Sequence, residues 1–127
     1  MSHVLLLEPN TVLAAAYTEA LQHAGHTVAH TTGAQAAIHA ADAQAPDAVL
    51  LELLLPQHNG VEFLHEFRSY TDWQTTPVIV NTVLHPSYLG GLHTVLVEDF
   101  GVQTILYKPQ TSLQEVVRAV RGHTSQT

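Results

Sequence analysis

The 127-residue chain is long enough for one domain with a buried core, and its 46% hydrophobic against 12% charged residues is typical of a compact globular fold. It has no cysteine, which excludes disulfides, cysteine-ligated zinc and a thiol nucleophile. Its net charge of −7, with no lysine or arginine before Arg68, offers little to neutralise phosphates, so we expect no direct nucleic-acid binding.

The amino terminus lacks the basic residues and the long apolar run of a targeting segment. Its apolar stretch, Val4 to Leu7, is too short for a signal peptide or a membrane-spanning helix. We therefore expect a cytoplasmic location and no membrane partner.

Five short apolar runs alternate with segments of helical period. In chain order the sequence predicts strand 4–7, helix 11–24, strand 26–30, helix 33–43, strand 48–51, helix 61–68, strand 77–80, a helix between 87 and 100, strand 104–107 and helix 112–121. Gly25 and Pro46 end the first two helices, and a capping box of Ser112 and Glu115 opens the last. Gly90-Gly91 interrupts the predicted helix between residues 87 and 100.

This alternation predicts an α/β fold, a parallel sheet with helices on both faces. We expect one domain over residues 1–122 and a polar tail over 123–127. In such sheets functional residues gather at the carboxyl ends of the strands, which here carry Glu8, Pro9, Glu52, Thr82 and Lys108. A salt bridge between Lys108 and Glu52 or Glu8 that only satisfies charges would explain the same residues.

Segments 5–10, 49–60, 77–82 and 107–109 together resemble response-regulator (CheY-like) receiver domains of two-component phosphorelay signalling. An acidic residue four positions before Pro56 is the most specific part, and Lys108-Pro109, a peptide bond that is commonly cis in this family, is nearly as specific. The resemblance implies a flavodoxin-like receiver fold, a (βα)5 doubly wound five-stranded parallel sheet of strand order 2-1-3-4-5.

Receiver domains hold Mg²⁺ on an acidic pair after the first strand and on a phosphoacceptor aspartate after the third, while a lysine and a threonine engage the phosphoryl group. The resemblance assigns Glu8 to the first acid, Thr82 to the hydroxyl and Lys108 to the lysine. Glu52 stands at the phosphoacceptor position, and Pro9 replaces the second metal-ligating acid.

These two departures weaken the family's chemistry. Pro9 has no carboxylate for a metal that needs near-octahedral oxygen ligation, so we expect no cofactor and weak or absent Mg²⁺ binding. The added methylene of Glu52 displaces its carboxylate, which impairs in-line phosphoryl transfer. Two glutamates facing Lys108 are close to neutral without an ion.

A third departure concerns the switch positions, Thr82 and Ile105. The family often has an aromatic residue where Ile105 stands, and its rotamer reports phosphorylation. We expect Tyr107, the nearby aromatic residue of the same strand, to face the opposite way and not to replace it. The Gly90-Gly91 break is a candidate for an alternative element that communicates state.

Other residues carry weaker signals. His23, His26 and His30 lie on separate predicted elements and do not form a zinc-ligand pattern, so we interpret them as surface residues. His58 is a candidate hydrogen-bond partner of Glu52, with an exposed loop position as the alternative. We expect Trp73 to pack at the edge of the core.

The leading hypothesis is a pseudo-receiver: a protein-interaction module, not an enzyme, in which Glu52 fixes one conformation. The expected partners are a sensor histidine kinase, an output domain or another signalling protein, or a second copy through the face of the fourth helix, fifth strand and fifth helix. One alternative is an Mg²⁺-dependent phosphoacceptor that uses Glu52. Another is a small-ligand binder at the strand-end crevice, which lacks a glycine-rich phosphate loop.

Overall fold

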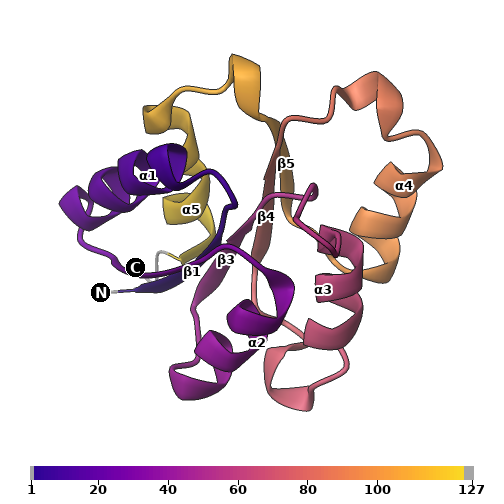
Figure 1. The fold of residues 1–127 in the computed structure, drawn as a ribbon, viewed down its shortest axis with the longest axis horizontal. Helices are drawn as coiled ribbons and strands as arrows, with labels where there is room; N and C mark the ends of the chain where they lie inside the picture. The colour runs from indigo at the N-terminus through magenta and orange to yellow at the C-terminus, as the bar shows by residue number, and fades with distance from the viewer. Residues whose placement is uncertain (1, 125–127) are drawn as a thin grey trace.

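The computed structural model describes residues 2–124 and contains a five-stranded parallel sheet of order β2-β1-β3-β4-β5, as predicted (Figure 1). The strands are β1 (His3–Leu7), β2 (Thr27–Thr31), β3 (Ala48–Leu51), β4 (Val78–Thr82) and β5 (Thr104–Tyr107). The helices are α1 (Thr11–His23), α2 (Ala34–Ala43), α3 (Gly60–Phe67), α4 (Gly91–Thr94) and α5 (Leu113–Thr124), with short helical turns η1 (Thr71–Trp73), η2 (Pro86–Tyr88) and η4 (Lys108–Gln110) and the π-helix η3 (Val95–Asp99).

The central strands are buried on both faces, which explains their uninterrupted apolar sequences. Because side chains alternate along a strand, Leu5 and Leu7 of β1 join the core on one face and Val4 and Leu6 join the core on the other. All five residues of β1 are buried. Every hydrogen-bonded strand pair is parallel.

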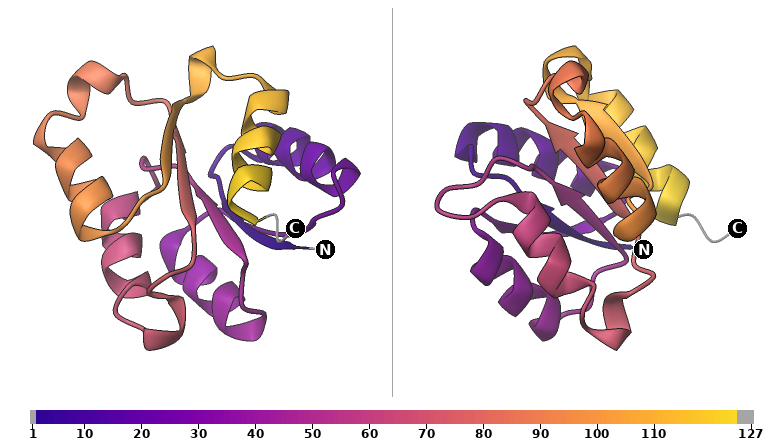
Figure 2. Two further views of the ribbon diagram at one scale, coloured as in Figure 1. Left: turned by 180° about the vertical axis from the view of Figure 1, so that it is seen from behind. Right: turned by 90° about the vertical axis from the view of Figure 1, so that its right-hand side faces the viewer.

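Helices cover the sheet in two layers. The layer of α2, α3 and α4 packs against the larger core cluster, and α1 and α5 pack against the smaller one (Figures 1 and 2). None of the helices in the described part of the chain is long and apolar enough to cross a membrane.

Most predicted elements are confirmed with ends shifted by one or two residues, but the carboxyl terminus differs. Helix α5 continues to Thr124, which is buried, so His123 and Thr124 are helical and not part of a polar tail. The remaining tail residues, 125–127, lie outside the described residues. No described peptide bond is cis, so the Lys108–Pro109 bond is trans and departs from what is common in the family.

The predicted helix between residues 87 and 100 is divided. Gly90 has a φ of 49°, a conformation that favours glycine, and separates η2 from α4. Helix α4 then passes directly into the π-helix η3. The Arg68 guanidinium donates a hydrogen bond to the carbonyl oxygen of Phe100, which follows the last residue of η3, at 2.8 Å. It also donates to the carbonyl oxygens of Trp73 and Thr76.

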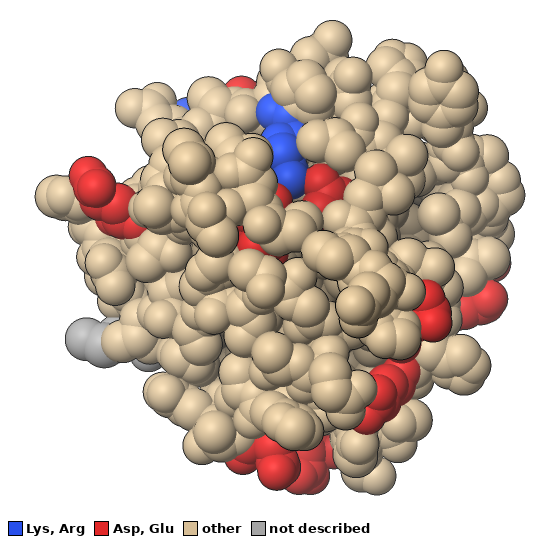
Figure 3. All heavy atoms as spheres, viewed as in Figure 1, with Lys and Arg blue, Asp and Glu red and all other residues tan. Residues whose placement is uncertain are grey.

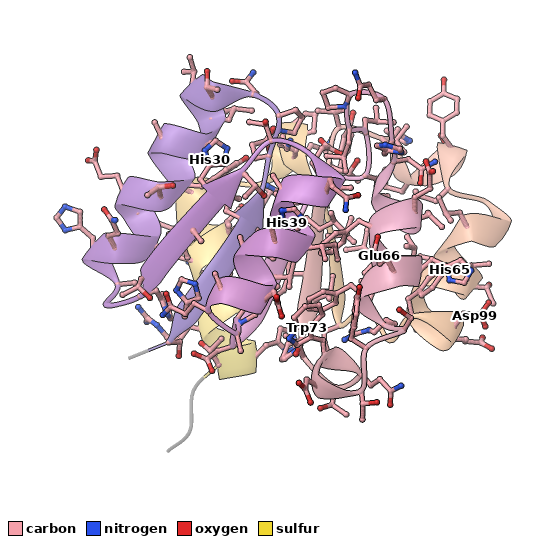
Figure 4. The ribbon with its side chains drawn as sticks, turned by 60° about the horizontal axis from the view of Figure 1, so that its bottom comes forward. His30, His39, His65, Glu66, Trp73 and Asp99 are labelled. Carbon is pink, nitrogen blue, oxygen red and sulfur yellow. The ribbon has the colours of Figure 1, made fainter. Side chains whose placement is uncertain are left out.

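Trp73 closes the lower edge of the core, as predicted. It is 6% exposed, and its ring stacks on Phe67 with a centroid distance of 5.0 Å. Figure 4 shows it beneath the ends of α2 and α3.

Candidate functional site

The predicted site residues meet at the carboxyl edge of the sheet. Glu8 follows β1, Glu52 follows β3, Thr82 ends β4 and Lys108 follows β5, and all four are buried. Their strands lie side by side in the sheet, which is why residues up to 100 positions apart in sequence come together. Figure 3 shows basic atoms enclosed beside acidic atoms in a hollow near the top of this face.

One ammonium group bridges the two carboxylates. Lys108 Nζ donates to Glu8 Oε1 at 2.6 Å and to Glu52 Oε1 at 2.7 Å. The Lys108 side chain is 7% exposed, and those of Glu8 and Glu52 are 3% and 2% exposed. The ion pair anticipated at this edge therefore involves both glutamates at once and is almost completely shielded from water.

Backbone donors engage the remaining carboxylate oxygens. Glu8 Oε2 accepts from the N–H of Asn10 at 3.0 Å. Glu52 Oε2 accepts from Leu54 N–H and Glu52 Oε1 from Val83 N–H, both at 3.1 Å. All four oxygens thus accept at least one hydrogen bond, which is the condition under which buried carboxylates are tolerated.

Burial and charge act in opposite directions on Lys108. Desolvation lowers the pKa of its ammonium group, but the hydrogen bonds and charges of Glu52 and Glu8 outweigh this and raise the pKa above its ordinary value. Lys108 is therefore a fixed positive charge at physiological pH.

Thr82 contacts the loop that follows β4. Its Oγ1 accepts from the N–H of Leu84 at 3.2 Å and so braces the loop after β4. In the described residues the hydrogen bond from this loop to Glu52 comes from the backbone of Val83. Sequence analysis missed the amide donors of residues 10, 54 and 83, because every residue except proline carries an N–H and none is marked by its side chain.

The loop after β3 is held close to the sheet by Gly60. Its N–H donates to Leu53 O at 2.8 Å, and a Cβ at this position would lie 2.9 Å from the Leu53 Cα. Asn59 and Glu62 form a capping box that starts α3 directly after this turn. The turn fixes the position of Leu54 N–H beneath the Glu52 carboxylate.

The expectation for Tyr107 is wrong. Tyr107 is two residues from Ile105, and alternation along a strand places both on the same face, whereas Leu106 packs against the core on the opposite face. Ile105 packs at the border of the larger core, and the Tyr107 ring contacts His85 edge-on at a centroid distance of 5.1 Å. An aromatic residue is therefore present on this face of β5, at its end.

In the described residues no histidine side chain hydrogen-bonds to the Glu8, Glu52 or Lys108 side chains, although His30 Nε2 forms a hydrogen bond with the backbone oxygen of Glu8 at 2.9 Å. His58 pairs with Glu62 at 3.5 Å in an exposed loop, and no hydrogen bond joins it to Glu52 in the described residues. Figure 4 shows His30, His39 and His65 on separate elements. Within residues 2–124 no group of three or more histidine, aspartate or glutamate side chains is arranged to hold a metal ion.

Comparison with known proteins agrees with this geometry. Residues 4–121 match the family model of the response regulator receiver domain. The chain belongs to this family, whose members are signalling modules of two-component systems.

Relatives among characterised proteins include response regulator ArlR of Staphylococcus epidermidis, 28% identical over 124 residues that cover 96% of this chain and 52% of ArlR. The chain spans about half the length of this relative. Similar solved structures include Vibrio cholerae chemotaxis protein CheY4, with a TM-score of 0.84 and 19% identity over 97% of this chain and 98% of that one. The receiver domain of sensor histidine kinase PA1611 from Pseudomonas aeruginosa, which has a magnesium ion in its active site cleft, gives a TM-score of 0.82 and 24% identity over 98% of both chains.

Proposed function

We propose that this domain is a pseudo-receiver, a protein-interaction module that is not phosphorylated. The observation that carries the proposal is the hydrogen bonding of Lys108 Nζ to both Glu8 and Glu52. The lysine that would neutralise an incoming phosphoryl group is already engaged by the side chain at the acceptor position. Phosphorylation would have to break this buried ion pair.

In this proposal the Glu52 carboxylate stands in for a transferred phosphoryl group. It reaches one methylene further than aspartate and joins Lys108, the loop after β3 and the loop after β4 through three hydrogen bonds. A carboxylate held by donors from three elements partly imitates a phosphoaspartate. We infer that it fixes both loops in one conformation without a reaction.

The residues present do not fit a receiver-type magnesium site. Mg²⁺ prefers several hard oxygen ligands in octahedral geometry, whereas Pro9 supplies no side-chain ligand and the oxygens of Glu8 and Glu52 already accept hydrogen bonds. A cation bound between the glutamates would compete with the Lys108 ammonium for the same two Oε1 atoms. We therefore propose that Mg²⁺ is not a cofactor.

The surface supports an interaction role. A hollow of about 460 Å³ beside Lys108 is lined by the apolar residues Leu13, Tyr17, Val83 and Leu113, among others, and suits an apolar side chain of a protein better than a phosphate-bearing ligand. Partners of the proposed module are a sensor kinase, an output domain or another cytoplasmic signalling protein. We also propose that a second copy of the domain binds the face formed by α4, β5 and α5. Near this face the hydrophobic residues Tyr88 and Val97 are 79% and 42% exposed.

The decisive experiment is intact-mass analysis after incubation with acetyl phosphate and Mg²⁺. We expect the mass of this protein to remain unchanged while a receiver domain with aspartate at the acceptor position gains a phosphoryl group in the same reaction. A phosphoryl adduct that is lost in Glu52→Ala would overturn the proposal and support an Mg²⁺-dependent phosphoacceptor instead.

A further inference from the structure

The exposed arginines of this acidic domain lie close together on one helix. The Ser112 hydrogen bonds are the larger cause of a lowered pKa of the Glu115 carboxyl, to which the charge of Arg118 also contributes. Lys108 is bound between two glutamates, and Arg68 donates to three backbone carbonyls. Arg118 and Arg121 are both exposed on α5, and within residues 2–124 neither forms an ion pair. They are three positions apart on the helix and therefore project from neighbouring places on its surface.

Helices α1 and α5 lie side by side on one face of the sheet (Figures 1 and 2). Both arginines border a hollow between these two helices. We call this hollow the α1–α5 groove. It has a volume of about 440 Å³ and is lined by Ala20, His23, Ala24, Leu113, Gln114, Val117, Arg118 and Arg121. The volume falls within the range typical of ligand-binding pockets.

The groove exists because α1 carries small side chains opposite α5. Ala20 and Ala24 are four residues apart and therefore lie on one face of the helix, where a larger side chain would fill the space. Leu113 remains 43% exposed at one end. The result is an apolar floor with cationic groups along its edge.

This combination selects among possible occupants. A second copy docked symmetrically would bring the Arg118–Arg121 pairs of both copies together, and like charges repel. Nucleic acid is disfavoured because two arginines are few against a net charge of −7. An amphipathic helix with carboxylates three or four residues apart matches both the apolar floor and the arginine spacing.

We propose that the α1–α5 groove binds an acidic, amphipathic helical segment of a protein partner, with Arg118 and Arg121 pairing with its carboxylates. The inference rests on the proposed interaction role and names its surface. It does not depend on whether Glu52 accepts a phosphoryl group.

A displayed library of amphipathic helical peptides, about four turns long, tests the proposal by selection on the whole domain. We expect the enriched peptides to carry aspartate or glutamate pairs three or four residues apart. Their amide shift changes should centre on α1 and α5. Arg118→Gln with Arg121→Gln should weaken binding roughly tenfold or more, because it removes charge-assisted hydrogen bonds.

Matched variants distinguish binding in the groove from a general effect of the net charge of the domain. Ala20→Leu should weaken binding by filling the groove, whereas Ala15→Leu, at an exposed position outside the groove on the same helix, should not. Gln74→Glu with Gln103→Glu alters the net charge as much as the arginine double variant does, but at exposed positions elsewhere, and should leave affinity unchanged.

Enrichment of neutral or basic peptides, equal enrichment on the arginine double variant, or shift changes centred on another face would each overturn the inference. So would failure to enrich any peptide, or a dimer that dissociates when the arginines are replaced. Repeating the binding measurement with Glu52→Ala keeps this result separate from the phosphorylation test, because the proposed contact does not involve Glu52.

Discussion

At the scale of single residues, the site contains a buried ion cluster of two carboxylates and one ammonium group. Glu8 and Glu52 share the one ammonium group of Lys108, and backbone N–H groups supply the remaining donors. Burying such groups is costly, and a complete set of hydrogen bonds offsets the desolvation. Removing one member should therefore cost more than replacing all three.

We expect Lys108→Met to lower the free energy of unfolding by about 3–5 kcal/mol, because it leaves two carboxylates buried without a cation. Urea denaturation measures this change. The triple variant Lys108→Met, Glu8→Gln, Glu52→Gln should recover most of the loss, since no charge then remains. Wild-type stability in Lys108→Met alone would show that the cluster contributes little.

His26 predicts a dependence of stability on pH. Its two ring nitrogens are enclosed and have no hydrogen-bond partner in the described residues. Burial lowers its pKa below 6.5, Arg121 lowers it further, and Asp47 opposes them. Because the unfolded chain then binds a proton at higher pH than the folded one, the contribution of His26 is fully present above pH 6.5 and is lost as pH falls through the folded pKa.

The measurement is the free energy of unfolding at several pH values between about 7.5 and 5 for the wild type and for His26→Gln. We expect the wild type to lose more stability than the variant over this interval. Parallel curves would contradict the assignment, because the other histidines are common to both proteins.

At the scale of secondary-structure elements, the termini of helices position the site. The turn before α3 places Leu54 N–H under Glu52 and depends on close backbone contact at Gly60. Gly91, which begins α4, has open space around it. The two glycines occupy the same position of their helices and differ in what surrounds them.

We expect Gly60→Ala to destabilise the domain by about 1–3 kcal/mol, since its Cβ would meet the backbone of Leu53. Gly91→Ala should be neutral or stabilising by up to about 1 kcal/mol, because it reduces the freedom of the unfolded chain. Thermal unfolding compares the two variants. A larger loss for Gly91→Ala would contradict this explanation.

At the scale of the whole molecule, the parallel sheet brings four strand ends to one edge and leaves two helical layers for contacts with partners. Glu52 joins the loops after β3 and β4 from within this edge. The α1–α5 groove lies on one layer and the exposed Tyr88 near the other. This arrangement agrees with the proposed pseudo-receiver, which would present its surfaces to partners without switching.

If the scaffold is otherwise that of a receiver, Pro9→Asp with Glu52→Asp should bind Mg²⁺ at least about tenfold more tightly than the wild type, because it restores hard oxygen ligands. Calorimetric titration measures the affinity. Pro9→Asn with Glu52→Asn is the matched control without the added carboxylates. Equal affinities in all three proteins would show that the site has diverged beyond these two positions.

The sequence determined the fold and the composition of the site. Apolar runs such as 48–51 specify strands buried on both faces, helical periods separate them, and each strand is followed by its polar residue. These signals are local in the sequence, so they predict the elements without knowledge of the tertiary structure. The resemblance to receiver domains supplied the strand order, which the structure confirms.

The tertiary structure alone decided how the site is connected. Glu8 and Lys108 are 100 residues apart, and no local pattern states that one Nζ bridges two carboxylates or that Val83 N–H, not the Thr82 hydroxyl, bonds Glu52. The α1–α5 groove likewise arises where side chains of two helices distant in sequence meet. Such contacts depend on distances of a few ångströms between elements, which packing of the whole domain sets and a linear pattern does not encode.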